Sequence, residues 1–251
     1  MSYPILVAHR GYAARYPENT LAALQAAVAA GARWLEFDVQ FSADGVPVLL
    51  HDTGLQRTAG RAGSVFDLEA RQLQAINVGE PDRFGDRFAA VRLPLLAEVA
   101  AWLESESRVQ AFVEIKAESI QHFGAERVLR ALREALAPVH DRCVLISYDD
   151  AFLFAARLAA PGRIGWVVSG YDDAHRRRAE ALAPDVLFIN HTRLPPEPEP
   201  LWPGPWQWAC YEIGTADQAL ALGARGIAFV ESMAVGELLA DPRLTPASPH
   251  G

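Results

Sequence analysis

The sequence has few of the features that mark secreted, zinc-binding or nucleotide-binding proteins. Its 251 residues contain only two cysteines, Cys143 and Cys210, and no Cys-x-x-Cys pair. A thiolate zinc site and a disulfide framework are therefore not expected. The chain has no glycine-rich phosphate loop of the G-x-G-x-x-G or G-x-x-x-x-G-K type, which argues against a nucleotide cofactor. Charged or amide side chains interrupt its longest apolar stretches, so we expect no membrane-spanning segment.

The chain is also short of positive charge. Lysine and arginine total 23 against 31 aspartates and glutamates, which gives a net charge of −8. Such a protein is poorly suited to bind nucleic acid or an anionic membrane surface. An anionic substrate would need a local source of positive charge, such as a metal ion. The first residues, Met-Ser-Tyr-Pro, do not form a basic region followed by a long apolar run, so we expect no signal peptide and a cytoplasmic location.

Short apolar runs alternate with helical patterns, which indicates an α/β fold. Eight extended segments are expected, at Pro4–Ala8, Arg33–Asp38, Ala111–Ile115, Cys143–Ser147, Arg163–Val168, Val186–Asn190, Trp206–Cys210 and Gly226–Val230. Helical spacing is found between most of them, at Thr20–Ala30, Ala125–Ala137, Ala151–Ala160, Asp173–Leu182 and Thr215–Leu222. Alternating strands and helices indicate a parallel sheet, and eight such units fit a closed (β/α)8 TIM barrel spanning residues 1–251 as one domain. Periodicity alone leaves an open, doubly wound sheet as the alternative.

One segment departs from this alternation. After Asp38, two apolar runs flank Asp44-Gly45, a strong hairpin signal. A two-residue turn there pairs three sets of apolar residues on one face: Val39 with Leu50, Phe41 with Val48, and Ala43 with Val46. This register returns His51 to the level of Asp38, at the end of the second strand.

Two further segments are expected to lie outside the regular alternation. Residues 54–107, with helical turns near Asp67–Ala75 and Leu95–Leu103, form an insertion after the second strand, and such insertions usually cover the catalytic rim. Residues 194–205 contain six prolines in twelve positions. Because proline disrupts helices, this segment predicts an extended loop in place of one barrel helix.

Three carboxylates lie at predicted strand ends, where a barrel carries its chemistry. Glu36 and Asp38 are two residues apart at the end of the second strand, so they project to one face. Glu114 lies at the end of the third strand. Without a counter-ion these groups would repel one another and their pKa values would rise. A hard divalent cation, Mg²⁺, Ca²⁺ or Mn²⁺ rather than zinc, resolves that conflict. For each acid alone, an ordinary charge paired with a neighbour remains the alternative.

Two histidines and two cations lie beside these acids in the sequence pattern. A lone histidine at a strand end is more often a hydrogen-bonded core residue, but the position of His9 and His51 next to the carboxylates favours an acid–base pair. Arg10 and Lys116 supply fixed positive charge for an anionic oxygen, and arginine can hold a phosphate through two parallel bonds. A salt bridge to a neighbouring acid is the equal alternative for either cation.

Other residues have mainly structural interpretations. Thr20 or Asn19 is assigned as the cap of the first helix, with Glu18 near its positive end. Trp208, near the end of the seventh strand, either packs in the barrel or lines the pocket.

At these positions the sequence resembles the glycerophosphodiester phosphodiesterase family. The resemblance is carried by Ala8-His-Arg-Gly11, Pro17-Glu-Asn-Thr20, Glu36-Phe-Asp38, Asp44-Gly45 with Val48 through His51-Asp52, and Glu114-Ile-Lys116. Arg57-Thr58 and residues 63–68 look like the small insertion of that family, and Ile146-Ser-Tyr148 resembles its strand-four pair. Together and in order, over about the first two-thirds of the chain, these motifs are specific.

The resemblance implies a metal-dependent barrel that cleaves small-molecule glycerophosphodiesters to glycerol 3-phosphate and an alcohol. It implies one divalent ion, Mg²⁺ or Ca²⁺ with Mn²⁺ as a third candidate. By position, the family's metal ligands correspond to Glu36, Asp38 and Glu114, its acid–base pair to His9 and His51, and its phosphate contacts to Arg10 and Lys116, to which we add Trp208 as a candidate substrate contact. The implied chemistry is attack by the glycerol 2-hydroxyl on phosphorus, followed by hydrolysis of the cyclic phosphate. The oligomeric state stays open.

The last third departs from the family pattern. Trp208-Ala-Cys-Tyr211 stands where the family usually has Trp-Thr-Val-Asn, and Gly223 through Glu231 replaces a Gly-x-Asp-Gly-Ile-Ile-Thr-Asp strand. The far wall of the pocket, and with it the preferred substrate, is therefore open. Two alternatives follow: a barrel that binds a phosphorylated ligand without turning it over, and a phosphodiesterase acting on lysophospholipids. The second needs an apolar entrance, which Phe66, Phe84 and Phe88 of the insertion could form unless they only pack on the rim.

Overall fold

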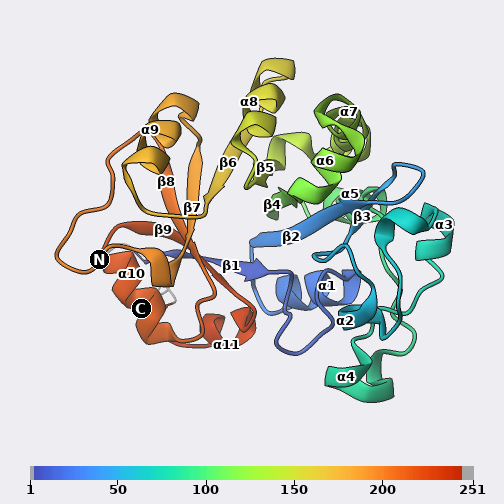
Figure 1. Cartoon of the computed structure of the whole chain (residues 1–251). Helices are drawn as coiled ribbons and strands as arrows, with labels where there is room; N and C mark the ends of the chain where they lie inside the picture. The colour runs from blue at the N-terminus through green and yellow to red at the C-terminus, as the bar shows by residue number, and fades with distance from the viewer. Residues whose placement is uncertain (1–2, 245–251) are drawn as a thin grey trace.

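The computed structural model describes residues 3–244, and its central feature is a closed barrel of eight parallel strands (Figure 1). The strands are β1 (Ile5–His9), β2 (Trp34–Phe41), β4 (Gln110–Ile115), β5 (Cys143–Ser147), β6 (Arg163–Val168), β7 (Val186–Asn190), β8 (Gln207–Tyr211) and β9 (Ile227–Ser232). Strand β1 pairs with both β2 and β9, which closes the barrel. The expected (β/α)8 barrel is thus confirmed over the open sheet, and all eight expected strands are present.

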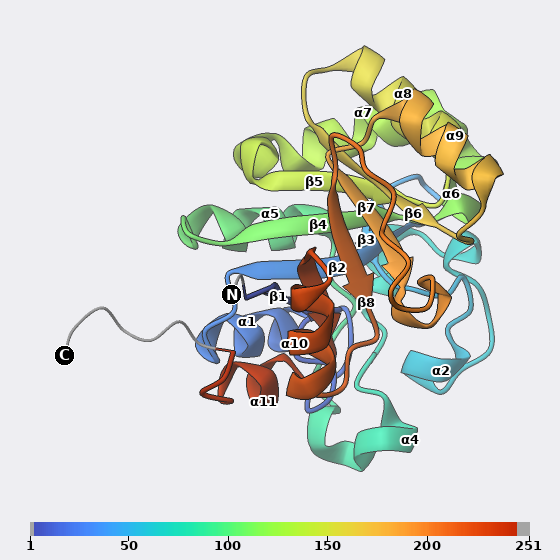
Figure 2. The same ribbon diagram turned by 90° about the vertical axis from the view of Figure 1, so that its left-hand side faces the viewer.

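Helices surround the barrel, as Figure 2 shows from the side. The longer ones are α1 (Leu21–Ala29), α5 (Leu96–Ser105), α7 (Ala125–Leu136), α8 (Asp150–Ala159), α9 (Asp173–Leu182) and α10 (Ala216–Ala224), with the shorter α6 (Ala117–Phe123) and α11 (Val235–Leu239). Each covers the outer face of the sheet because it has an apolar side; in α7 that side carries Val128, Leu129, Leu132 and Leu136.

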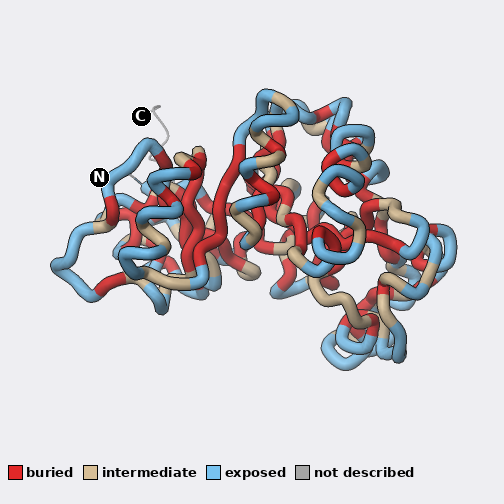
Figure 3. The backbone as a smooth tube through the Cα atoms, turned by 45° about the horizontal axis from the view of Figure 1, so that its top comes forward, coloured by how far each residue is buried: buried red, intermediate tan, exposed pale blue. Residues whose placement is uncertain are grey.

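Two layers of buried side chains hold the barrel together. Figure 3 shows that the buried residues lie mainly along the central strands. Inside the barrel, Trp34 and Phe112 stack with ring centroids 4.6 Å apart, and Phe229 and Phe188 meet Phe112 edge to face. The larger layer lies between the strands and the helices. Since both faces of every strand are covered, the strands read as nearly continuous apolar runs. Polar side chains that interrupt those runs at the strand ends therefore stand out.

The hairpin after β2 forms, but its register differs by one residue from the expectation. Strand β3 (Pro47–Leu49) runs antiparallel to β2 and pairs Val39 with Leu49 and Phe41 with Pro47. The turn has three residues because Ser42 N–H donates to the Val46 carbonyl at 3.0 Å, while Ser42 Oγ donates to Asp44 Oδ1 at 2.6 Å. Burial on both faces of the hairpin explains the error, since the apolar pattern then favours neither register.

The insertion after the hairpin is shorter than expected. Helix α5 packs against the barrel, so the insertion proper covers residues 54–94, with α2 (Gln56–Ala59), α3 (Ala70–Leu73) and α4 (Pro81–Phe84) on one side of the molecule (Figure 1). Its apolar side chains form a core together with Val48 and Leu50 of the hairpin. Glu80 Oε1 accepts a hydrogen bond of 2.6 Å from Glu18 N–H, and Arg83 donates to the Ala13 carbonyl at 2.7 Å. The insertion therefore lies against the loop that follows β1, at the rim where strands end.

The proline-rich segment forms the expected loop. Between β7 and β8 there is only the short 3-10 helix η4 (His191–Arg193), followed by extended chain. Among residues 3–244, none of the helices has the length and apolar character needed to cross a membrane.

Candidate active site

A cavity of about 120 Å³ opens at the carboxyl ends of the barrel strands. His9, Arg10, His51, Glu114 and Lys116 all line it. These residues come from β1, the hairpin and β4, which are separated by up to 107 residues in the chain. The closed barrel brings them together because parallel strands end on the same rim.

The three carboxylates converge at this cavity, which Glu114 itself lines. Ligand atoms of Glu36, Asp38 and Glu114 lie within 4.8 Å of one another, and Glu36 and Asp38 are each 1 % exposed. Burial, with the nearby charge of Asp38, raises the pKa of Glu36 well above its usual range, and burial likewise raises the pKa of Glu114. For Asp38 burial acts in the same direction, but the charges of Lys116 and Arg10 outweigh it and hold its pKa below its usual range. The cluster thus has three carboxylates against two cationic side chains, Lys116 and Arg10.

Lys116 and Arg10 are the two cations of the cluster. Lys116 Nζ lies 2.7 Å from Asp38 Oδ1 and 2.6 Å from Glu114 Oε1, and Arg10 Nε lies 3.2 Å from Asp38 Oδ2. Lys116 is the only lysine of the chain, which otherwise uses arginine for all 22 of its fixed cationic side chains. An ammonium is a compact point charge with three donors, so it fits between two carboxylates where a planar guanidinium would not.

The turn after β1 explains why glycine follows His9-Arg10. Arg10 has a φ of +55° and Gly11 a φ of +80°. A Cβ on Gly11 would lie 2.7 Å from the backbone carbon of Ala23 in α1, so only glycine fits here. This turn directs Arg10 N–H to Glu36 Oε2 at 3.0 Å. The turn therefore fixes both Arg10 and Glu36 at the rim.

The two histidines have different surroundings. His9 is 7 % exposed, and its Nε2 lies 3.8 Å from Glu36 Oε2. Burial, with the charge of Arg10, lowers the pKa of His9 to about 3, so its imidazole is neutral at physiological pH. The side chain of His51 is 34 % exposed, and its Nδ1 lies 2.6 Å from Asp52 Oδ1. That contact fixes the orientation of the His51 ring and leaves its Nε2 for the cavity.

Glu18 and Asn19, which the sequence places at the start of the first helix, belong to the site. Thr20 is the cap of α1 and accepts from Ala23 N–H. Asn19, in contrast, holds Asp38 from two sides, because its Nδ2 donates to Asp38 Oδ2 at 2.8 Å and its Oδ1 accepts from Asp38 N–H at 3.0 Å. Glu18 accepts from Arg10 Nη1 at 3.0 Å and from Arg57. Asn19 has a positive φ of +53°. A backbone conformation of this kind cannot be predicted from the spacing of residues in the sequence.

The divergent last strands place Tyr211 and Glu231 at the cavity, beside Tyr148, which follows β5. Tyr211 at the end of β8 and Glu231 on β9 both line the cavity, which answers a question that the sequence left open. Tyr211 and Tyr148 hydroxyls lie 2.9 Å apart, and the Tyr211 ring is 6.4 Å from that of His9. Burial raises the pKa of Glu231 well above its usual range, and the charge of Glu114 acts in the same direction. The far wall therefore adds a phenol pair and a fourth acid.

Trp208 does not reach the cavity, which corrects its candidate role as a substrate contact. It is 5 % exposed on the outer face of β8, and its Nε1 donates to the Trp202 carbonyl at 3.2 Å. Its ring lies 6.0 Å from that of Tyr171. Since side chains alternate along a strand, Tyr211, three positions further on, points to the opposite face and takes the place at the cavity.

The phenylalanines of the insertion do not line the cavity either. Phe66 stacks on His122 at 4.4 Å, and Phe84 meets Phe88 edge to face. The apolar entrance that the lysophospholipid alternative needs therefore does not form from these side chains.

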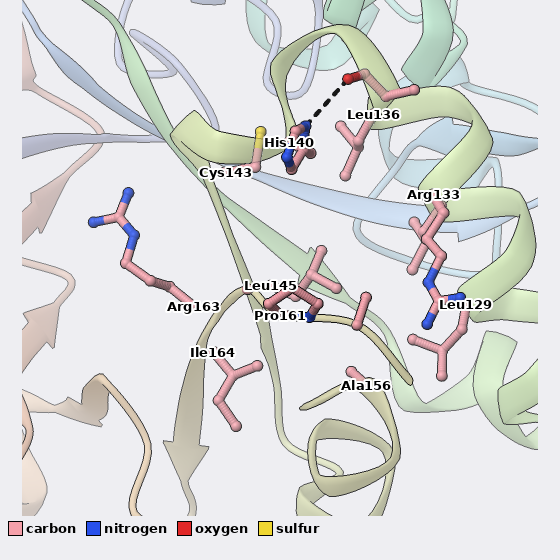
Figure 4. A pocket seen from close by; sticks show the side chains of 14 residues that line it. Leu129, Arg133, Leu136, His140, Cys143, Leu145, Ala156, Pro161, Arg163 and Ile164 are labelled. Carbon is pink, nitrogen blue, oxygen red and sulfur yellow. Dashed lines mark hydrogen bonds between the residues drawn. The ribbon is translucent and has the colours of Figure 1, made fainter. Parts of the chain in front are cut away.

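A separate cavity of about 430 Å³ lies between α7 and α8 (Figure 4). Leu129, Leu136, Cys143, Leu145 and Ile164 surround it with mainly apolar atoms. Cys143 and Ile164 are at the amino ends of β5 and β6, so this cavity opens at the opposite end of the barrel from the carboxylates. It therefore takes no part in the candidate site.

Comparison with known proteins agrees with this geometry. Residues 9–198 match the model of the glycerophosphoryl diester phosphodiesterase family. A glycerophosphodiester phosphodiesterase of Caldanaerobacter subterraneus is 32% identical over 158 residues, which are 62% of this chain and 63% of that protein. The chain therefore matches less than two thirds of the length of this curated relative.

Solved structures match nearly the whole chain. A phosphodiesterase of Oleispira antarctica, solved with the product sn-glycerol-3-phosphate, superposes with a TM-score of 0.81 at 25% identity, over 94% of this chain and 95% of that one. A structure from Silicibacter pomeroyi described as a putative glycerophosphoryl diester phosphodiesterase shares the fold, with a TM-score of 0.80 at 21% identity over 97% and 95% of the two chains. With the family model covering most of the sequence, the chain belongs to the glycerophosphoryl diester phosphodiesterase family.

Proposed function

We propose that this protein hydrolyses glycerophosphodiesters to glycerol 3-phosphate and an alcohol, with the help of one divalent cation. The observation that carries the proposal is that His9, His51, Arg10 and Lys116 line one cavity at the carboxylate cluster. A phosphodiester needs proton transfer at two oxygens and stabilisation of negative charge on the phosphoryl group. This cavity offers both kinds of group within one small volume.

Glu36, Asp38 and Glu114 suit a hard divalent cation. They offer only oxygen ligands, and Glu36 Oε1 is buried without a hydrogen-bond partner. Buried unpaired carboxylates are costly, and a cation removes that cost. Mg²⁺ and Ca²⁺ are the proposed occupants, with Mn²⁺ as a third candidate. A divalent cation bound there supplies positive charge that stabilises the phosphoryl oxygens as the reaction proceeds.

The two histidines are suited to opposite proton transfers. Buried His9 is neutral, so it can accept a proton from the hydroxyl group that attacks phosphorus. The Asp52 carboxylate holds the His51 ring through Nδ1, which leaves Nε2 to donate a proton to the leaving oxygen. In the first step the nucleophile is the glycerol 2-hydroxyl of the substrate, which is already tethered near phosphorus. In the second step the roles reverse as water opens the cyclic phosphate.

Arg10 and Lys116 hold the anionic parts in place. Arg10 is anchored by Glu18 at 3.0 Å and Lys116 by Glu114 at 2.6 Å, so both cations are oriented before substrate binds. Such preorganised charge stabilises a transition state without reorganisation during the reaction.

Release of glycerol 3-phosphate from glycerophosphocholine and related diesters tests the proposal. We expect turnover with Mg²⁺, Ca²⁺ or Mn²⁺, reversible loss of activity in EDTA, and loss of activity in His51→Ala and Glu114→Ala. Full activity of either variant in chelator would refute it. Tight binding of glycerophosphocholine without product, with each of the three metals, would favour the binding-only alternative. Release of lysophosphatidic acid from lysophospholipids with no activity on the diesters would favour the lysophospholipid alternative.

A further inference from the structure

The carboxylate of Glu231 has no partner although it is buried. The residue lies on β9 opposite Val7 of β1 and is 3 % exposed. No hydrogen bond or ion pair joins its side chain to another residue within the described part of the chain, and its Oε1 is fully buried. An unpaired buried carboxylate destabilises a protein unless a ligand or a proton compensates. Its place in the candidate site suggests that a ligand does so.

Glu231 belongs to a group of three ligating side chains. One ligand atom each from His9, Glu36 and Glu231 lies within 4.8 Å of the others, and all three residues are more than nine-tenths buried. Each of them also has a buried polar atom without a hydrogen-bond partner: His9 Nδ1, Glu36 Oε1 and Glu231 Oε1. Unsatisfied atoms of this kind are rare in folded proteins and call for an occupant.

The neighbouring group of Glu36, Asp38 and Glu114 is satisfied differently. Asp38 accepts from Asn19 and pairs with Lys116 at 2.7 Å, and Glu114 accepts from Lys116 at 2.6 Å. Neither Asp38 nor Glu114 has a buried, unpartnered oxygen in residues 3–244. The unmet ligating capacity of the site therefore lies with Glu36, His9 and Glu231, none of which forms a side-chain ion pair with Arg10 or Lys116 in the described residues.

The donor atoms of the two groups also differ. The first offers three carboxylates, whereas the second offers an imidazole and two carboxylates. Mg²⁺ and Ca²⁺ prefer oxygen, while Zn²⁺ binds histidine nitrogen together with carboxylate oxygen. We propose that His9, Glu36 and Glu231 form a second cation site that prefers Zn²⁺ to Mg²⁺ and that inhibits the enzyme when it is filled.

Zinc bound at this site would inhibit the enzyme because it would occupy His9. A ring nitrogen that ligates Zn²⁺ has its lone pair in that bond and cannot accept a proton from the substrate. Glu36 is shared by both groups, so zinc also competes for a carboxylate of the first group. This consequence rests on the proposed function, whereas the zinc site itself rests only on the geometry.

Calorimetric titration of Zn²⁺ into the whole protein, held in saturating Mg²⁺, tests the site. We expect one Zn²⁺ to bind per chain and to abolish release of glycerol 3-phosphate. In Glu231→Gln, which keeps the size of the side chain but removes its charge, we expect zinc affinity to fall about tenfold or more, since even outer residues of metal sites have effects of that size. The midpoint for zinc inhibition should rise by the same factor.

Glu212→Gln is the matched control. Glu212 lines the same cavity, but it accepts a hydrogen bond from Asn190 at 2.7 Å and offers no atom to the group. Its substitution should leave zinc affinity unchanged. Equal zinc affinity of Glu231→Gln and the wild type would overturn the site, as would equal losses of Zn²⁺ and Mg²⁺ affinity with one ion per chain. The latter result would make Glu231 a ligand of the single proposed ion.

Zinc X-ray absorption of the wild-type protein keeps the test independent of any variant that fails to fold. We expect the scattering pattern of one histidine ring, and oxygen-only coordination would overturn the proposal. Zinc binding with this signature in a protein inactive on all diesters would refute the proposed function and leave the zinc site standing. Activity on the diesters without any zinc binding would refute the zinc site and leave the proposed function standing.

Discussion

Arg57 and Glu18, which are 39 residues apart, form a two-point contact in which Arg57 Nη1 and Nη2 donate to the two carboxylate oxygens at 2.8 Å each. Arg57 Nε also donates to Asp52 Oδ2 at 2.7 Å, and Asp52 Oδ1 contacts His51 Nδ1 at 2.6 Å. A continuous chain of charged groups thus runs from buried Glu18 to His51. Arg57 does not line the cavity, so we treat it as a positioning residue.

We expect Arg57→Ala to lower kcat by about 10²-fold, because small misplacements of a catalytic group have effects of that order. KM should change much less, because Arg57 does not line the cavity and so does not contact the substrate. Arg57→Lys should restore little, since a lysine cannot form the parallel pair. Steady-state kinetics measures both effects. Arg61→Ala, an exposed arginine of the same insertion, is the control, and wild-type kcat in Arg57→Ala would contradict the positioning role.

Glu18 should make stability depend on acid pH. Burial alone would raise its pKa, but hydrogen bonds from Arg57 and the charges of Arg10 and Arg57 lower the pKa below the usual 4.5. A carboxyl with a depressed pKa stabilises the fold above the unfolded-state value and loses that contribution as pH falls through the folded-state value. We expect Glu18→Gln to lower the free energy of unfolding by about 1.5–3 kcal/mol at pH 7.

The difference between Glu18→Gln and the wild type should shrink progressively below pH 4.5. Urea unfolding of both proteins at several pH values gives this difference directly, and other acids cancel in the comparison. A gap that stays constant down to the acid limit would show that the Glu18 charge does not contribute in this way.

Lys116 should be hidden from amine reagents in the folded protein. Burial would lower its pKa, but the charges of Asp38 and Glu114 outweigh it and raise the pKa above the usual value. The side chain is protonated and 8 % exposed, so reductive methylation should modify only the α-amine of this chain. Because the chain has a single lysine, mass spectrometry reads the result without ambiguity. Denaturant should expose Lys116, and rapid labelling of the native protein would contradict the buried ion pair.

Both cysteines should be unreactive in the folded protein. Burial raises the pKa of Cys143 and of Cys210 to about 12. The thiolate, which is the reactive form, is then present at about one part in 10⁴ at pH 8. Ellman's reagent should report no thiols in the native protein and two after unfolding. Prompt reaction of one thiol without denaturant would place Cys143, which borders the apolar cavity, in contact with solvent.

Much of the barrel and part of the site could be predicted from the sequence, because both depend on the local pattern of apolar and polar residues. Alternating apolar runs and helical spacing predict parallel strands, and parallel strands necessarily end on one rim. Glu36, Asp38, Glu114 and His9 are at such ends, so their convergence required no knowledge of packing.

What the tertiary structure decided lies beyond local pattern. The strands are apolar on both faces, so the sequence could not show that Trp208 faces outward and Tyr211 inward, nor fix the register of the hairpin. The links from Glu18 to Arg57 and from Glu36 to Glu231 join residues 39 and 195 positions apart. The first distance is set by the packing of the insertion on the loop after β1. The second is set by closure of the barrel, because the pairing of β9 with β1 determines which side chain lies beside His9.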